Sequence, residues 1–296
     1  MTRSEYMIKK YDDFRVQYIG KKMEFYRHPS SERIDPFRIA DRLYYVGDKK
    51  VCMHLIDTDD GLILIDSGYL GTEHILVDNI WRAGFDPRNV KIILHTHGHS
   101  DHFGASEEFK RMYGSKLVIS KIDADLVRRT DPSSTLYPLA TAPTFDEEIE
   151  DGDIIELGSV KIRCVLSPGH TEGVLSLFFD VTYEGKSYTA GLFGGAGTNA
   201  LSLPYMYKNG YENLPEKMLK SIEMLRGEKV DIHLGNHPGN NDTIGKREKQ
   251  LIEGGNPFID EGSWGRFLDK LERKVHEVIS ENERLNAEYD AAYGKE

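Results

Sequence analysis

The segment NVKIILHTHGHSDHFGAS, residues 89–106, joins an apolar run to a loop crowded with histidine. Four of the chain's 11 histidines, together with one aspartate, fall between positions 95 and 102. The apolar run is typical of a strand buried on both faces, and residues 103–113 predict a helix that ends at Gly114. The loop therefore leaves the carboxyl end of a buried strand and enters a helix, where open α/β folds place their functional sites.

The spacing within HGHSDH suits two neighbouring metal positions. In an extended loop, residues two apart point the same way and the next neighbour points elsewhere. His97 and His99 are therefore separated from Asp101 and His102, so that two groups of ligands can form. Imidazole nitrogen and carboxylate oxygen are the zinc ligands expected where no thiol is available. We reject a solvated histidine tract, because it explains neither the strand before the loop nor the helix after it.

The remaining chain shows strands followed by a helix, twice over. Thr72 looks like the N-cap of the helix in the first half. In the second half, β-rich runs span residues 152–193, with a hairpin turning at Glu184-Gly185, and a helix follows from Pro215 to Leu225. This order predicts an α/β fold in which two sheets pack face to face with helices outside.

The absence of a Pro/Ser-rich linker between the halves indicates one domain, which we place at residues 37–260. Residues 1–36 are polar and aromatic without a strand period, and we interpret them as an N-terminal arm. Residues 261–296 contain a long amphipathic helix, 263 to 290, with Ser263 as its cap. The apolar stripe of this helix predicts that it packs on the domain.

Composition restricts the partners. The formal net charge of −11 disfavours nucleic acid, because binding a phosphate backbone requires a basic stripe. No run approaches the roughly 20 apolar residues of a membrane span, and no apolar stretch of a secretory signal follows the first residues. We therefore expect a cytoplasmic protein that acts on a small-molecule substrate, without a membrane or nucleic-acid partner. The oligomeric state stays open.

The motif HGHSDH resembles the His-x-His-x-Asp-His signature of the metallo-β-lactamase superfamily, whose fold is an αββα sandwich of two mixed sheets. The likeness covers about residues 37 to 240 and includes LILIDSG, SPGHTEG and GNHPG. The pattern is most similar to that of the third subclass of class B β-lactamases, which implies two Zn²⁺ ions per chain. The resemblance assigns one zinc to His97, His99 and His170, and the other to Asp101, His102 and His237.

A missing aspartate favours this subclass. Glyoxalase-II-like, lactonase-like and RNA-processing members carry a bridging aspartate at the end of the strand after the third histidine. Here that strand ends YTAGLFGG, and the corresponding place looks like Gly191, whereas Asp180 comes too early. The glycines of the following FGGAGTN are interpreted as a loop that passes close to the metals.

The segment VDIHLGNHPG offers two histidines for the last ligand position. In a strand, Val230, Ile232 and Leu234 would point to the core and His233 to the other side. His237 lies in the loop beyond the strand, in the His-Pro-Gly context of the family. We therefore assign His237 to the second zinc and give His233 a structural role.

The resemblance implies a zinc-dependent hydrolase that uses a metal-bound hydroxide. Asp101 would both bind zinc and accept a hydrogen bond from the hydroxide, which makes it the candidate catalytic residue. Asp66, in LILIDSG, is expected to support the site by orienting a zinc-binding histidine. His95 is expected to be packed or to play a similar supporting part.

Three functions stay open. The motifs are most like those of a β-lactamase that cleaves the cyclic amide of β-lactams. The alternative is a cytoplasmic zinc hydrolase of another ester, lactone, thioester or phosphodiester, with at most incidental β-lactam turnover. The missing signal favours this alternative, as does Val174, where β-lactamases usually carry serine. A redox or binding protein of the same fold comes last, because the diiron relatives have an acidic residue where this chain has His99.

Overall fold

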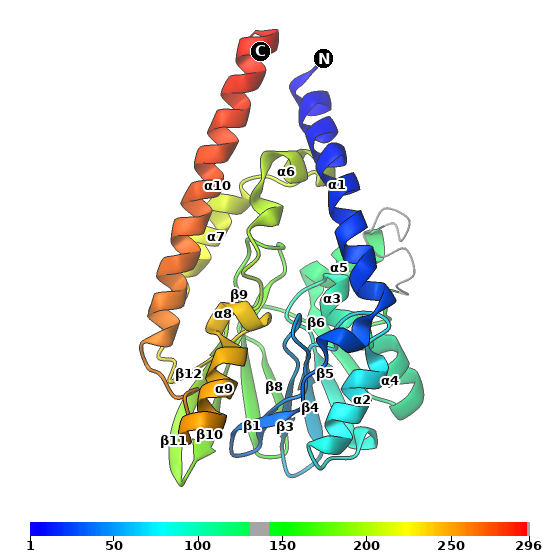
Figure 1. The fold of residues 1–296 in the computed structure, drawn as a ribbon, viewed down its shortest axis with the longest axis vertical. Coiled ribbons are helices and arrows are strands. Elements are labelled where there is room, and N and C mark those ends of the chain that lie inside the picture. Colours follow the sequence, from blue (N-terminus) through cyan, green and yellow to red (C-terminus); the bar gives the residue numbers. More distant parts are fainter. Residues whose placement is uncertain (131–141, 295–296) are drawn as a thin grey trace.

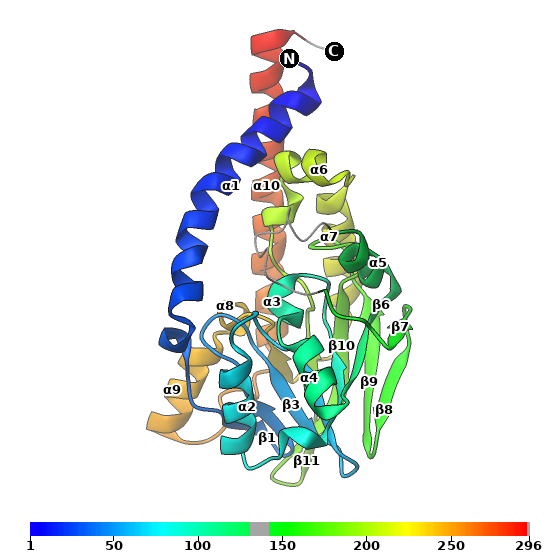
Figure 2. The same ribbon diagram turned by 90° about the vertical axis from the view of Figure 1, so that its right-hand side faces the viewer.

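The computed structural model describes residues 1–130 and 142–294, with the backbone alone for residues 16–27. Two mixed β-sheets face each other, and helices lie outside both of them (Figure 1; Figure 2). This arrangement confirms the αββα sandwich expected from the sequence. None of the helices in the described residues is long and apolar enough to cross a membrane.

The first sheet has seven strands in sequence order. They are β1 (Phe37–Ala40), β2 (Leu43–Tyr45), β3 (His54–Asp57), β4 (Leu62–Ile65), β5 (Val90–Leu94), β6 (Lys116–Ser120) and β7 (Glu147–Ile149). Neighbours from β1 to β4 are antiparallel, and those from β4 to β7 are parallel. The loops that follow β4 and β5 therefore emerge from the same edge of the sheet.

The second sheet has the order β12-β11-β10-β9-β8. Its strands are β8 (Ile154–Leu157), β9 (Val160–Leu166), β10 (Leu175–Tyr183), β11 (Lys186–Leu192) and β12 (Ile232–Leu234). The β10–β11 hairpin turns at Glu184 and Gly185, whose φ angles are 50° and 76°. Two consecutive positive φ values are typical of the tight turn that matches the twist of a hairpin, so the predicted turn is confirmed.

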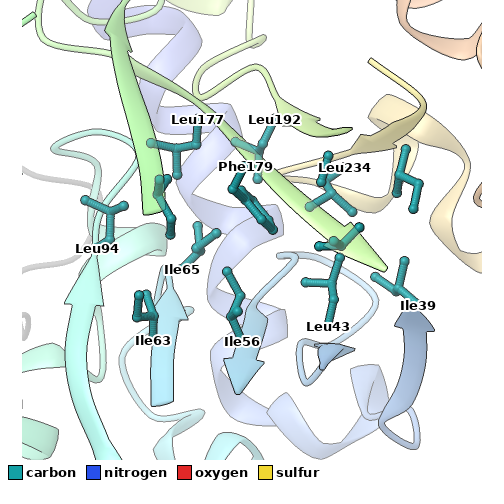
Figure 3. Packing of buried hydrophobic residues seen from close by; sticks show 14 of the residues in the cluster. Ile39, Leu43, Ile56, Ile63, Ile65, Leu94, Leu177, Phe179, Leu192 and Leu234 are labelled. Atoms are coloured by element: carbon teal, nitrogen blue, oxygen red, sulfur yellow. The ribbon is translucent and has the colours of Figure 1, made fainter. Parts of the chain in front are cut away.

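The core lies between the two sheets, where side chains from alternate strand positions meet (Figure 3). In β4, Ile63 and Ile65 belong to this inner cluster, whereas Leu62 and Leu64 face the outer helices. Burying an aliphatic side chain of this size contributes roughly 1.5–3 kcal/mol. The strand is apolar throughout because both of its faces are covered.

Ten α-helices occur in the described residues. They are α1 (Arg3–Arg27), α2 (Glu73–Arg82), α3 (Ser100–Phe103), α4 (Ser106–Tyr113), α5 (Lys121–Arg129), α6 (Leu203–Asn209), α7 (Leu214–Leu225), α8 (Pro238–Asn241), α9 (Thr243–Glu253) and α10 (Ser263–Tyr293). Short 3₁₀ helices occupy Pro29–Glu32, Pro87–Asn89 and Asn199–Leu201. Helices α2 and α4 pack on the outside of the first sheet, and α7 and α10 on the outside of the second.

Two expectations about helix ends were wrong and a third was confirmed. The helix expected at residues 103–113 begins only at Ser106, as α4, after Gly104, which packs directly against the backbone of Tyr69 and Leu70. Thr72 is the N-cap residue of α2 as expected, although its hydroxyl donates to the Tyr69 carbonyl at 2.7 Å and makes no capping hydrogen bond. Ser263 is the first helical residue of α10, and Gly262 occupies the N-cap.

The N-terminal arm contains the long helix α1, which extends beyond the sandwich and approaches α10 near the outer ends of both helices (Figure 1; Figure 2). At the outer end of this pair, the Arg3 guanidinium lies 2.6 Å from the Asp290 carboxylate. On α1, the Tyr11 ring contacts Tyr205 of α6 edge-on, and the ring centroids are 5.9 Å apart, within the range of about 4.5–7 Å typical of aromatic pairs. Helix α6 thus lies against α1 on the side of the sandwich from which the histidine loop emerges.

Candidate metal centre

Three histidines from two loops form the first ligand group. His97 and His99 follow β5, and His170 lies between β9 and β10. Each offers a ring nitrogen within 4.8 Å of the others, and His99 Nδ1 is 2.9 Å from His170 Nε2. The structure therefore brings together the residues assigned to the first zinc.

The second ligand group combines Asp101 and His102, from the start of α3, with His237, which precedes α8. Asp101 Oδ2 lies 3.7 Å from Nε2 of both His102 and His237. The ring centroids of His97 and His102 are 4.1 Å apart, so the two groups are adjacent. This geometry has the form of a dinuclear centre.

Backbone carbonyls orient three of the histidines. The Nδ1 atoms donate to carbonyl oxygens in the pairs His97–Gly194 (2.9 Å), His170–Gly197 (2.7 Å) and His237–Lys50 (2.7 Å). A carbonyl only accepts, so the proton is on Nδ1 and the Nε2 lone pair points into the site. The two glycine carbonyls belong to the FGGAGTN loop, which therefore passes beside the ligand groups as expected.

Asp66 orients His102. It is fully buried directly after β4, and its Oδ2 lies 2.7 Å from His102 Nδ1. The backbone N–H and the hydroxyl of Thr96 also donate to this carboxylate, both at 2.8 Å. A carboxylate held in this way fixes the ring orientation and the tautomer of a metal-binding histidine. The structure thus places Asp66 where the sequence predicted a supporting role.

His95 lies behind the ligand groups and belongs to neither of them. It is fully buried, its Nδ1 donates to the Val118 carbonyl at 2.8 Å, and its Nε2 lies 2.6 Å from the Ser106 hydroxyl. Ser106 in turn lies 2.7 Å from the hydroxyl of Ser67, the neighbour of Asp66. His95 therefore packs the region beneath the site.

Asp123, in the first turn of α5, is a site residue that the sequence reasoning missed. Its buried carboxylate accepts hydrogen bonds from Gly98 N (2.7 Å), Thr171 Oγ1 (2.6 Å) and Gly173 N (2.9 Å). These donors belong to the two loops that carry the first ligand group. Burial raises the pKa of Asp123 to about 6. The sequence signal was the capping pattern Ser120-x-x-Asp123, which identifies the start of α5 but not the inward direction of the carboxylate.

We expect Asp123→Ala to loosen the first ligand group. The variant leaves three donors without their acceptor, and a loss of about 2–4 kcal/mol in the free energy of unfolding follows from the usual size of such defects. Metal affinity should fall roughly 10–100-fold, as for other residues that position ligands. Denaturant unfolding and metal titration measure the two effects.

The control for this experiment is Asp125→Ala on the same helix. Asp125 is exposed and pairs with Arg128, so both quantities should stay near those of the unmodified protein. Wild-type metal affinity in Asp123→Ala would contradict the positioning role.

An unpaired buried nitrogen tests whether the ligand groups fit metal ions. Nε2 of His97 is buried and has no hydrogen-bond partner. Burial, followed by the neighbouring His102, holds the pKa of His97 well below its ordinary value. Burial and then His99 do the same to the pKa of His170. Neutral imidazoles with free lone pairs are the form that binds metal, so the residues fit two divalent cations with nitrogen and oxygen ligands, such as zinc.

The strand that was expected to lack a bridging carboxylate is β11. A Cβ at Gly191 would lie 2.5 Å from Val230 Cγ2, on the outer face of the second sheet, whereas its neighbours Ala190 and Leu192 face the inner core. None of the three positions holds a carboxylate, and residues 186–199 contain no Asp or Glu at all.

Comparison with known proteins agrees with this geometry. Residues 47–182 match the family model described as "Metallo-beta-lactamase superfamily". The subclass B3 metallo-beta-lactamase BJP-1 of Bradyrhizobium japonicum is similar with a TM-score of 0.78 and 26% identity, over 86% of this chain and 96% of that one. For the metallo-beta-lactamase FEZ-1 of Legionella gormanii the TM-score is 0.76 and the identity 30%, over 85% and 98% of the two chains. The chain belongs to the metallo-β-lactamase superfamily.

Curated relatives carry hydrolase names. The hydroxyacylglutathione hydrolase of Chelativorans sp. is 25% identical over 153 residues, which are 51% of this chain and 52% of that protein. That of Methylococcus capsulatus is 29% identical over 146 residues, 49% and 44% of the two chains. The matched region thus spans about half the length of these relatives. Together with the family and the site, these names identify the chain as a metal-dependent hydrolase.

Proposed function

We propose that this protein is a dinuclear zinc hydrolase of a carbonyl substrate, with His97, His99 and His170 on one zinc and Asp101, His102 and His237 on the other. The observation that carries the proposal is the pair of adjacent ligand groups, supported by the buried Nε2 of His97, which has no hydrogen-bond partner. When bound, zinc lowers the pKa of a coordinated water and polarises a carbonyl oxygen. No side-chain nucleophile is then required.

Asp101 is the residue proposed to handle the proton. Among the described residues that line the cavity at the site, the carboxylates are Asp101 and Glu281. Glu281 lies on α10, where it pairs with Arg284. Asp101 Oδ2 lies between His102 and His237, so it can accept a proton from the attacking water and hold that water in place.

β-Lactams are the first substrates to test, because the solved structures named as β-lactamases resemble this chain over most of its length. Val174 stands where β-lactamases usually carry serine, and it offers no polar contact to such a substrate. Val174 is fully buried and would lie 2.7 Å from a Cβ at Gly195, so it packs under the FGGAGTN loop. Other esters, lactones, thioesters and phosphodiesters are the second class of substrates to test.

We expect elemental analysis of carefully prepared protein to find about two zinc ions per chain, because the ligands form two complete sets. The same preparation is then tested with nitrocefin, a penicillin, a carbapenem, and a panel of lactones, thioesters and phosphodiesters. Iron, or one metal ion that saturates activity, would contradict the dinuclear zinc assignment. Turnover of esters or lactones without β-lactam turnover would select the second class.

A further inference from the structure

A cavity of about 1010 Å³ extends from the ligand groups toward α1, α6 and α10. His99, Asp101, His170 and His237 line one end of it. The other walls come mainly from α1, α5, α6 and α10, of which α1 and α10 extend beyond the sandwich (Figure 1; Figure 2). Pockets for drug-sized ligands measure roughly 300–1,000 Å³, so this cavity has room for far more than a reacting carbonyl group.

The far part of the cavity has aromatic and aliphatic walls. These side chains come from the four helices α1, α5, α6 and α10, and include Tyr11, Phe14, Leu126, Tyr205, Val278 and Leu285. Phe14 of α1 is 58% exposed despite its large ring. An exposed aromatic side chain at the wall of a cavity gains free energy when an apolar ligand covers it.

The helices around this part of the cavity are fixed to one another. Asn282 of α10 donates to the Leu201 carbonyl at 2.9 Å and accepts from Leu203 N at 2.8 Å, which holds the start of α6. Lys208 of α6 pairs with Asp12 of α1 at 3.1 Å. The cavity is therefore enclosed by specific contacts between α1, α6 and α10.

The charged side chains along this wall have partners of their own. Arg284 pairs with Glu281 and Glu288 on α10, and Lys10 lies 4.0 Å from Glu288. The positive charges of Arg284 and Lys10 are therefore balanced by carboxylates of the protein, and a ligand needs no charged group to pair with them. The surface left for a ligand is mainly that of the aromatic rings and aliphatic side chains.

We infer, on the basis of the zinc hydrolase function proposed above, that the substrate is an ester with a medium or long acyl chain. The chain occupies the apolar part of the cavity, which places the carbonyl carbon at the ligand groups. In the reaction, the oxygen of water bonds to the acyl carbon, the bond from that carbon to the alcohol oxygen breaks, and a proton passes to the alcohol. The products are a fatty carboxylate and an alcohol.

The test compares p-nitrophenyl acetate, butanoate, octanoate and decanoate with the zinc-loaded full chain. Each methylene that leaves water should raise kcat/KM about two- to fourfold, until the cavity is filled. Calorimetric titration with decanoate and with butanoate measures the affinity for the chain itself, without catalysis. We expect decanoate to bind at least tenfold more tightly than butanoate.

Phe14→Asp places a charge in the apolar wall, at a side chain exposed enough for folding to continue. The ratio of decanoate to acetate kcat/KM should fall at least tenfold, and decanoate binding should weaken in parallel. Leu251→Asp is the matched control, because Leu251 is 67% exposed on α9 and does not line the cavity. This control should leave the ratio unchanged.

Different results separate the two proposals. Acetate hydrolysis without any gain from longer chains would overturn the acyl-chain inference and leave the zinc hydrolase in place. If the zinc-loaded protein hydrolysed no carbonyl substrate, the proposed function would fail. The decanoate titration would then still test whether the apolar part of the cavity binds an acyl chain. Equal affinity for decanoate and butanoate would overturn the inference.

Discussion

Removal of both metal ions by a chelator is expected to lower hydrolysis to the uncatalysed rate, and zinc should restore it. Zinc lowers the pKa of bound water from about 15.7 to about 7, which raises the hydroxide fraction at neutral pH by roughly 10⁸. The described residues that line the cavity include no cysteine. Ser100 is the serine of this lining that is next to the ligands, and its neighbours His99 and Asp101 belong to the two ligand groups, so neither is available to activate it as a nucleophile. A serine-directed inhibitor should therefore leave activity unchanged.

Chelation should also lower the melting temperature, because metal ions that bind the folded chain stabilise it by mass action. The buried Nε2 atom of His97, which has no hydrogen-bond partner within the protein, is one of the groups that lose their metal. Thermal unfolding with and without zinc measures this effect separately from catalysis. Full activity after the metal content has fallen to background would contradict the mechanism.

The candidate site was predictable because its ligands lie in short motifs. His97, His99, Asp101 and His102 are consecutive or nearly so, and the apolar run before them indicates where the loop emerges. His170 and His237 came from the family resemblance, and the structure brings both to the loop. The sheets were predictable for a similar reason, since strand pairing between neighbours in the sequence accounts for most of both sheets.

The residues around the ligands were harder to predict, because their roles depend on distant parts of the chain. Asp123 joins loops near Gly98 and Gly173 that are 25 and 50 residues away. The helix α5 that carries it has an ordinary amphipathic sequence. The cavity likewise requires α1, α6 and α10 to converge. No local pattern in the N-terminal arm predicts that α1 contributes to the wall of this cavity.

The strand before the last ligand combined a correct and a wrong expectation. Ile232 and Leu234 face the inner core as predicted, but Val230 lies in the outer cluster. Strand alternation does not extend to Val230, because β12 begins only at Ile232. His233 points to the outer side, where its ring packs against Trp264 and Phe267 of α10.

His237→Ala is expected to keep the first zinc, weaken the second, and lower kcat/KM by about 10²-fold or more. The replacement removes one of three ligands in its group, and a site with two protein ligands falls short of the three that catalytic zinc usually has. The first group keeps all three histidines, so about one zinc should remain. Metal titration and steady-state kinetics on the same preparation measure both effects.

His233→Ala is the matched control, because this histidine lies four residues earlier yet belongs to neither ligand group. It is buried, with Nδ1 3.2 Å from the Ser263 hydroxyl, so its removal leaves a small cavity between β12 and α10. The expected cost is about 1–3 kcal/mol in the free energy of unfolding, with zinc content near that of the unmodified protein. If His233→Ala lost the second zinc and His237→Ala kept it, the two assignments would have to be exchanged. Such a result would contradict this structure, in which the His233 ring packs against α10 and His237 lies in the second ligand group.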